Sequence, residues 1–226
     1  INRSVFRDFS EYVALMDKER SKKLLIDGIR INLFLLAPLS ILMVTLANPI
    51  VSLLLERLHF SAQAVTSTAL ALQFYSIGLI GWGIHTLTGR FFAARLETRT
   101  SMLLDFSLLA FHVPLVILLS RSPLRFAGIA LATSVSYLTF ALVRVAVIMH
   151  KLKRDNVRVA YGEIISAAGK TLSACLLMVI AIIEAKFVFN RIQFNSRFME
   201  NIIFFVSLTF MGTAVYFLSS LLLKNT

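Results

Sequence analysis

The sequence is poor in cysteine and in charged residues. Cys175 is the single cysteine among 226 residues, so an intrachain disulfide is impossible and a thiolate metal site would lack its other ligands. Charged residues make up 15% of the chain, whereas an average soluble domain has about 25%. These two shortages exclude a disulfide framework and an ordinary soluble globular domain.

Sequence motifs of the common enzyme families are also missing. The chain has no GxxxxGK(S/T) phosphate-binding loop, no HExxH zinc motif and no GxSxG nucleophile motif. The four histidines, His59, His85, His112 and His150, lack the spacing of metal ligands. We therefore expect no enzymatic activity, no catalytic residue, no metal site and no cofactor.

Apolar residues are abundant instead. They make up 58% of the chain, and the mean hydropathy is +0.80. The net charge of +11 comes from basic residues scattered between long apolar segments, not gathered on one polar face, so we expect no nucleic-acid partner. This composition indicates an integral membrane protein.

Long apolar runs predict an all-α fold, a polytopic transmembrane helical bundle with about six spans. A membrane helix needs about 20 apolar residues, because its backbone polar groups must be satisfied within the segment. Asp105 lies near one end of the third run, and we expect it to snorkel to the interface. The expected spans are residues 31–55, 68–88, 102–120, 126–149, 165–189 and 201–223.

The loops between these spans alternate in their content of basic residues. One set of alternate segments holds 15 Lys and Arg residues and the other holds 6. Cytoplasmic loops are enriched in positive residues, so we expect the richer set, and with it both ends of the chain, to face the cytoplasm. The richer set consists of residues 1–30, 89–101, 150–163 and the tail after residue 223.

Residues 1–30 differ from the apolar runs that follow. Val5, Phe9, Tyr12 and Met16 recur at helical spacing among charged residues. This pattern predicts an amphipathic helix in the membrane interface, followed by a turn.

The expected spans contain a row of small residues and two histidines. Gly128, Ala132 and Ser136 are spaced by four residues and predict a smooth helix face that allows close approach of a neighbour. His85 and His112 are ionisable groups within spans, which makes them functional candidates. The alternative is a neutral histidine that is hydrogen-bonded between helices, because no acidic residue lies nearby in the sequence.

Three stretches, in this order, resemble the MurJ/MviN lipid II flippase family. "DGIRINLFLLAPLSILMVTLANPIVSLLLERLHF", residues 27–60, is similar to the family's helix that opens with D-x-G-(L/I)-R. "YSIGLIGWGIHTLTGRFFAARLETRT", residues 75–100, resembles the family's helix and R-x-F-Y-A-x-x-D-T-(R/K)-T-P loop. "AGIALATSVSYLTFALV", residues 127–143, resembles its A-G-L-A-L-A-T-S helix.

The chain also departs from the family pattern. Ala93 replaces the usual Tyr of the loop, Glu97 the usual Asp and Ser101 the usual Pro. The basic residue that the family often carries in the preceding helix falls at Thr86, and Leu58 stands where the family tends to have Gly. These changes leave the chemistry and the activity of the loop open.

The resemblance implies two six-helix lobes of the exporter superfamily, followed by two extra helices. It divides this chain into an interfacial helix and turn at 1–30, four second-lobe helices at 31–150, a cytoplasmic loop at 151–164 and the two extra helices, which form a lipid-tail groove, at 165–226. The chain opens with Ile1 inside an expected helix, so we expect a fragment whose partner is the first lobe of the same protein.

The function implied by the resemblance is flipping of the undecaprenyl-diphosphate-linked peptidoglycan precursor, lipid II, by alternating access in the bacterial inner membrane. The implied partners are this precursor and membrane lipids. One alternative is export of another lipid-linked oligosaccharide or of a small molecule by the same superfamily fold, since fold does not set function. Another alternative is a nontransporting membrane scaffold.

The resemblance also suggests where a substrate would be held. Arg90, Glu97 and Arg99 match positions of the family's loop on the expected cytoplasmic side, and guanidinium groups bind phosphate oxygens well. Glu97 could instead pair with Arg99 or cap the next helix, and the arginines could serve membrane topology alone. The candidate substrate-binding residues are Arg90, Arg99, Glu97, Thr86 and Arg30.

Overall fold

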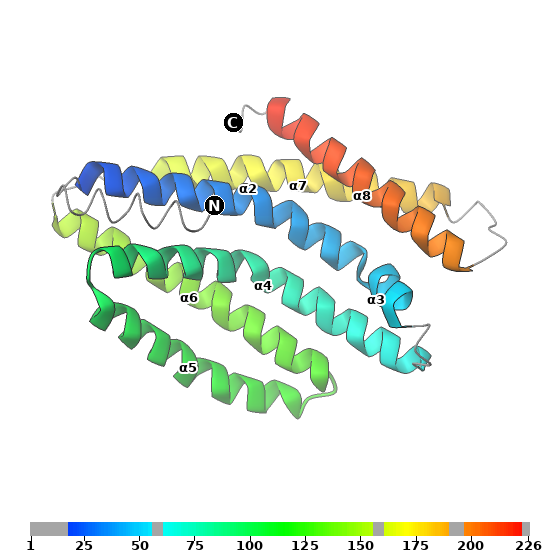
Figure 1. Ribbon diagram of the computed structural model, residues 1–226, viewed down its shortest axis with the longest axis horizontal. Coiled ribbons are helices and arrows are strands. Elements are labelled where there is room, and N and C mark those ends of the chain that lie inside the picture. The colour runs from blue at the N-terminus through cyan, green and yellow to red at the C-terminus, as the bar shows by residue number, and fades with distance from the viewer. Residues whose placement is uncertain (1–17, 56–60, 156–160, 190–196, 223–226) are drawn as a thin grey trace.

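The computed structural model describes residues 18–55, 61–155, 161–189 and 197–222. Within these ranges the chain forms seven α-helices and no strand (Figure 1). The helices are α2 (Lys18–Thr45), α3 (Ala47–Leu55), α4 (Ala62–Ala94), α5 (Thr98–Ser120), α6 (Phe126–Arg154), α7 (Tyr161–Phe189) and α8 (Arg197–Leu222).

The helices stack in an order that begins with α5 and ends with α8. The long helix α4 lies in the middle and packs on α6 and on α2 (Figure 1). α5 packs chiefly on the outer side of α6, whereas α7 and α8 pack on each other and on α2 and α3. The start of α2, the turn from α4 to α5 and the last turn of α6 lie together at one end, which we call the loop end.

Five helices in the described ranges are long and apolar enough to cross a membrane. The sixth expected span appears as the shorter apolar stretch Val206–Leu221 of α8. The prediction of an all-helical membrane bundle is confirmed. The five segments are Glu19–Thr45, Gln63–Ala94, Thr98–Ser120, Phe126–Arg154 and Ile164–Ala185.

The expected boundary at residue 30 is not present, and the expected span 31–55 is not one helix. α2 runs from Lys18 through residue 30 without a turn, because Leu25 and Ile29 are buried and favour a continuous helix there. The break at the other end follows Thr45. Pro49 has no N–H to donate to the carbonyl four residues earlier, so the α-helical ladder is interrupted at that point. The expected interfacial helix within residues 1–17 lies outside the described residues.

The expected loop at 151–164 is also shorter than its predicted bounds. α6 continues to Arg154, and α7 begins at Tyr161, so both helices extend into the segment. Only residues 155–160 lie between the two helices.

Two apolar clusters hold the bundle together. At the loop end, Leu25 and Ile29 of α2 pack with Leu87 and Phe92 of α4 and Leu152 of α6. A second cluster joins α2 to the last two helices and includes Leu42, Met178, Ile182 and Tyr216. Within it, the hydroxyl of Tyr216 donates a hydrogen bond of 2.7 Å to the backbone carbonyl of Phe34, which fastens α8 to α2.

Small residues allow α6 to approach both of its neighbours. A Cβ at Gly81 of α4 would lie 2.8 Å from the carbonyl oxygen of Tyr137, and a Cβ at Gly128 would meet the carbonyl of Leu119 in α5. Gly128, Ala132 and Ser136 are all buried. The smooth face expected from their spacing is therefore a real packing face.

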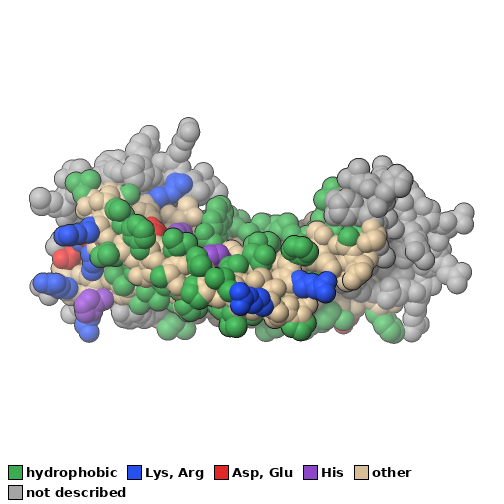
Figure 2. All heavy atoms as spheres, turned by 90° about the horizontal axis from the view of Figure 1, so that it is seen from below, with side chains coloured by type: hydrophobic (Ala, Val, Ile, Leu, Met, Phe, Trp, Pro, Cys, Tyr) green, Lys and Arg blue, Asp and Glu red, His purple; other side chains and the backbone are tan. Residues whose placement is uncertain are grey.

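α5 is the least covered of the membrane-spanning helices. It has no buried residue, and hydrophobic side chains such as Phe106 and Leu118 are exposed along it. Figure 2 shows hydrophobic side chains over the middle of the molecule, and basic side chains both at one end and beyond the middle. Acidic and histidine side chains also reach this surface among the hydrophobic ones.

Candidate functional site

The turn between α4 and α5 is fixed to the end of α6 by a network of charges. Arg95 donates from Nε to Glu97 Oε1 and from Nη2 to Asp155 Oδ2, both at 2.9 Å. Leu96 between them has a positive φ of 57°, unusual for a residue with a side chain. These ion pairs hold the turn in that conformation.

Glu97 takes part in a second link to α6. Its carboxylate accepts a hydrogen bond from Lys151 Nζ, which also donates to Thr100 Oγ1 at 3.0 Å. Glu97 occupies the N-cap position of α5, yet its side chain makes no capping hydrogen bond. The expected cap or pair with Arg99 is therefore not found, and Glu97 pairs with Arg95 and Lys151 instead.

The two candidate arginines of this region lie on different helices. Arg90 is on the last turns of α4 and is partly buried, whereas Arg99 is in the first turn of α5 and is exposed. In the described part of the chain, Arg99 has no ion pair. Both lie at the loop end, so the structure brings them to the same side of the bundle.

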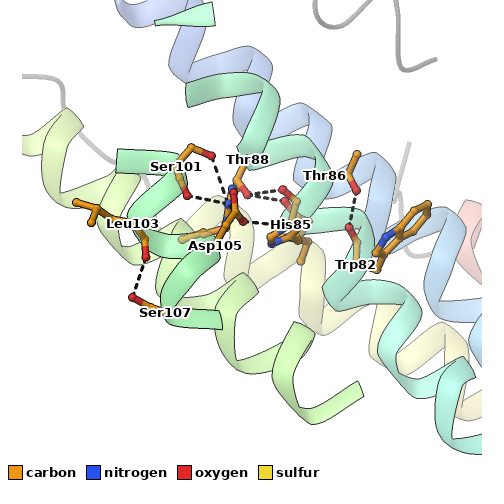
Figure 3. A network of polar contacts seen from close by, with 10 residues as sticks. Trp82, His85, Thr86, Thr88, Ser101, Leu103, Asp105 and Ser107 are labelled. Carbon is orange, nitrogen blue, oxygen red and sulfur yellow. Dashed lines mark hydrogen bonds and ion pairs between the residues drawn. The ribbon is translucent and has the colours of Figure 1, made fainter. Parts of the chain in front are cut away.

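Arg30 and Thr86 lie apart from this turn. Arg30 of α2 faces Asp27 at 3.6 Å between Nη1 and Oδ1 and lines a cavity of about 340 Å³ with Lys22 and Lys23. Thr86 donates from Oγ1 to the carbonyl of Trp82 at 2.9 Å within α4 (Figure 3). The Thr86 hydroxyl is thus used within its own helix.

A further charged site lies deeper along the helices, where α4, α5 and α6 meet. Arg144 of α6 is 1% exposed, and its Nη2 donates a hydrogen bond to Asp105 Oδ1 of α5. His85 of α4 faces the same oxygen, with 3.5 Å between Nε2 and Oδ1 (Figure 3). We call Arg144, Asp105 and His85 the three-helix triad.

The surroundings of Arg144 explain how a guanidinium group is accommodated there. Its Nη2 also lies 3.3 Å from Ser101 Oγ, and its Cζ lies 5.9 Å from the centre of the Phe92 ring. Charge pairing and a cation–π contact together lower the cost of burying this charge.

The triad continues into a polar stripe along α5. Ser101, Asp105 and His112 are spaced by four and seven residues and so share one helix face. His112 Nδ1 lies 3.2 Å from Ser136 Oγ of α6, while the ring of His85 meets Tyr137 edge-on with 5.3 Å between centroids. The face that joins α5 to α6 therefore includes polar contacts inside an apolar bundle.

Sequence reasoning missed this triad because its members are far apart along the chain. Asp105 was expected to snorkel to the interface, but it pairs with Arg144, 39 residues away. The absence of an acid near His85 in the sequence was misleading as well, since Asp105 approaches it from the next helix. The available signal was one acid and one base inside consecutive apolar helices, which membrane helices tend to pair.

Metal binding is not indicated by the described residues. No group of three or more His, Cys, Asp and Glu side chains in those ranges could hold a metal ion. The triad contains one acid and one histidine beside a permanent cation, a set suited to ion pairing and proton exchange.

Comparison with known proteins relates the whole chain to one family. A family model described as lipid II flippase MurJ matches residues 1–224. A probable lipid II flippase MurJ from Rickettsia prowazekii (strain Madrid E) is 27% identical over 206 residues, covering 90% of this chain and 39% of the relative. One from Thermotoga maritima is 35% identical over 112 residues, covering 50% of this chain and 24% of the relative.

A solved structure shows the same fold. A lipid II flippase MurJ in an inward closed conformation superposes with a TM-score of 0.76 at 18% identity, covering all of this chain and 43% of that one. The chain thus spans about two fifths or less of the length of these relatives. The family consists of flippases, which are transporters and not enzymes. Since the family model covers nearly every residue, the chain belongs to the MurJ lipid II flippase family.

Proposed function

We propose that the protein containing this chain flips the undecaprenyl-diphosphate-linked peptidoglycan precursor, lipid II, across the bacterial inner membrane. Its mechanism is alternating access, in which two lobes rock about a central cavity while nothing covalent happens to the substrate. The observation that carries the proposal is the family match over residues 1–224, supported by the shared fold.

The proposed orientation places the loop end in the cytoplasm, with both ends of the chain on that side. In its support, the described basic residues Lys22, Lys23, Arg95, Lys151 and Lys153 belong to segments that meet at the loop end (Figure 1). Positive residues are retained in the cytoplasm during insertion. This end is also where a substrate made in the cytoplasm would enter.

We assign two kinds of role to the candidate residues at this end. Arg90, Arg99 and Arg30 contact the anionic diphosphate as it enters, since guanidinium forms charge-assisted hydrogen bonds to phosphate oxygens. Glu97 supports the turn through its pairs with Arg95 and Lys151. Thr86 supports α4, because its hydroxyl is bonded to the backbone of its own helix.

The proposed partners are the lipid-linked precursor, membrane lipids and the first lobe of the same protein. The relatives are more than twice as long as the part that this chain covers, so transport involves residues beyond those described here. α7 and α8 pack on each other and on α2, with exposed apolar side chains such as Leu176 and Phe217. We propose that these two helices form the groove for the lipid tail.

The test is depletion of the full-length protein in its own cells. Lipid II accessible from the periplasmic face is measured together with total lipid II. We expect the accessible fraction to fall while total lipid II accumulates, and re-expression to restore both. If neither quantity changes in cells without a second flippase, another lipid-linked oligosaccharide or a scaffold role replaces the proposal.

A further inference from the structure

The three-helix triad has an uneven geometry that the proposed function does not use. Asp105 Oδ1 accepts a hydrogen bond from Arg144, whereas His85 Nε2 faces the same atom at 3.5 Å, beyond normal hydrogen-bond length. Within the described residues, Nδ1 of His85 is buried and has no hydrogen-bond partner. The imidazole is therefore beside the carboxylate without being held by it.

The charge of His85 determines whether Asp105 pairs with Arg144 alone or with both Arg144 and His85. With a neutral imidazole, the charge of one guanidinium balances that of one carboxylate, and this ion pair links α5 to α6. With an imidazolium, two cations from two different helices face one carboxylate. The closer approach of His85 to Asp105 then draws α5 toward α4 and weakens the hold of Arg144 on it.

The groups around His85 are few, and they come from three helices. α5 contributes Asp105, and α6 contributes Arg144 together with the edge of the Tyr137 ring. α2, which also packs on α4, brings the uncharged amide of Asn32 against Gly83. Asp105 is thus the acidic partner, and its side chain is 50% exposed among the described residues.

The helix on which these forces act, α5, is also held to α6 by the His112–Ser136 contact and by close packing at Gly128. α5 has no buried residue and packs chiefly on α6, with a much smaller contact to α4. Elements with few buried apolar contacts move at low free-energy cost. The network of Arg95, Glu97 and Lys151 anchors one end of α5, so a change at Asp105 tilts the helix about that end.

We propose that His85 is an intramembrane proton-binding site. Proton binding there makes His85, in place of Arg144, the main ion-pair partner of Asp105, and this exchange moves α5 relative to α6. The ligand is H⁺, taken up and released without any covalent change in the lipid. The inference rests on the proposed flippase function in one respect, because it names H⁺ as the ion whose binding sets the position of a transport helix.

The experiment measures the position of α5 in the full-length protein in lipid nanodiscs, without substrate. Native cysteines, including Cys175, are replaced, and spin labels are attached through Leu118→Cys on α5 and Leu176→Cys on α7, both exposed positions. Distance distributions are recorded by pulsed electron paramagnetic resonance at about pH 5 and about pH 8, which bracket imidazole titration. Ionic strength and the sodium concentration are kept constant.

We expect the parent protein to give different distance distributions at the two pH values, and His85→Gln to lose this difference. The matched control is His150→Gln, which removes an exposed histidine of α6 and should keep the difference. If His85→Gln does not fold, as judged by size-exclusion chromatography, Asp105→Asn replaces it and should also lose the response. A parent that is insensitive to pH, or a His85→Gln or Asp105→Asn variant that still responds, overturns the proposal.

Because no substrate is present, this result is independent of the flippase assignment. If α5 responds to pH but the protein fails the lipid II depletion test, the proton site stands and the lipid II assignment is rejected. If the protein passes the depletion test but the position of α5 does not depend on pH, the lipid II assignment stands and the proton site is rejected.

Discussion

Arg144 and Asp105 form an ion pair between α6 and α5 whose two partners differ sharply in exposure. The guanidinium is 1% exposed, whereas the side chain of the carboxylate is 50% exposed. Removal of the acid would leave a buried cation with Nε and Nη1 already lacking hydrogen-bond partners among the described residues. Loss of the base would leave an acid that is only half buried among the described residues.

This asymmetry predicts that Asp105→Ala destabilises the protein more than Arg144→Met does. Breaking a buried pair costs about 3–5 kcal/mol, and the half-exposed acid places Asp105→Ala near the lower value. The double variant Asp105→Ala, Arg144→Met should regain part of this loss, because no charge is left buried. Chemical unfolding in mixed micelles measures the three values, and equal effects of the two single variants would contradict the prediction.

The turn network predicts a smaller and local effect for Glu97→Gln. The variant removes the charge that faces Arg95 and Lys151, and partly exposed pairs of this kind contribute about 1 kcal/mol or less. We expect faster proteolytic cleavage within residues 89–101 and a small loss of unfolding free energy. Lys153→Gln, an exposed substitution on α6, is the control and should change neither.

Arg99→Gln should lower the rate of transport without changing stability. Arg99 is exposed and has no ion pair in the described part of the chain, so its replacement should leave the unfolding free energy unchanged. If it contacts the diphosphate as proposed, translocation of lipid II should fall at least about tenfold, since one charge-assisted hydrogen bond is worth about 1.5–3 kcal/mol. The measurement is the initial rate of translocation at matched protein levels, and an unchanged rate would restrict Arg99 to a role in topology.

Helix packing predicts that Gly81→Ala is harmful although alanine favours helices. The new Cβ would lie 2.6 Å from the backbone nitrogen of Leu138, and backbone atoms cannot move aside as a flexible side chain can. Overpacking of this kind costs about 1–3 kcal/mol. The control is Gly169→Ala in α7, where nothing lies within 4 Å, and which should be neutral or stabilise by up to about 1 kcal/mol. Thermal unfolding in detergent compares the two variants.

Much of the fold was accessible from hydropathy, because a membrane helix must satisfy its own backbone. The apolar runs at 102–120 and 126–149 correspond closely to α5 and α6. The continuation of α2 to Lys18 was missed, since Leu25 and Ile29 are buried by residues of α4 and α6 that hydropathy does not place beside them. The break after Thr45 has a local signal in Pro49, since proline can kink or end a helix, but the expected span 31–55 continues through it.

The site was less accessible than the fold. The loop residues Arg90, Glu97 and Arg99 were identified through a family resemblance, but the partners of Glu97 depend on how α6 ends beside the turn. The three-helix triad depends on the rotation of α4, α5 and α6 about their axes, which one sequence does not specify. His85 and Asp105 were both noticed, but their contact required the packed helices.

The exposure of α5 also bears on how the chain enters the membrane. α5 is the most hydrophobic of the five described spans, and the short turn Arg121–Arg125 connects it to the helix that carries Arg144. An isolated arginine within a membrane helix costs about 2.5–3.5 kcal/mol on insertion. When α5 and α6 leave the translocon as one hairpin, Asp105 neutralises Arg144 during insertion itself. The pair therefore lowers the cost of inserting the last helix of the hairpin as well as holding it in place afterwards.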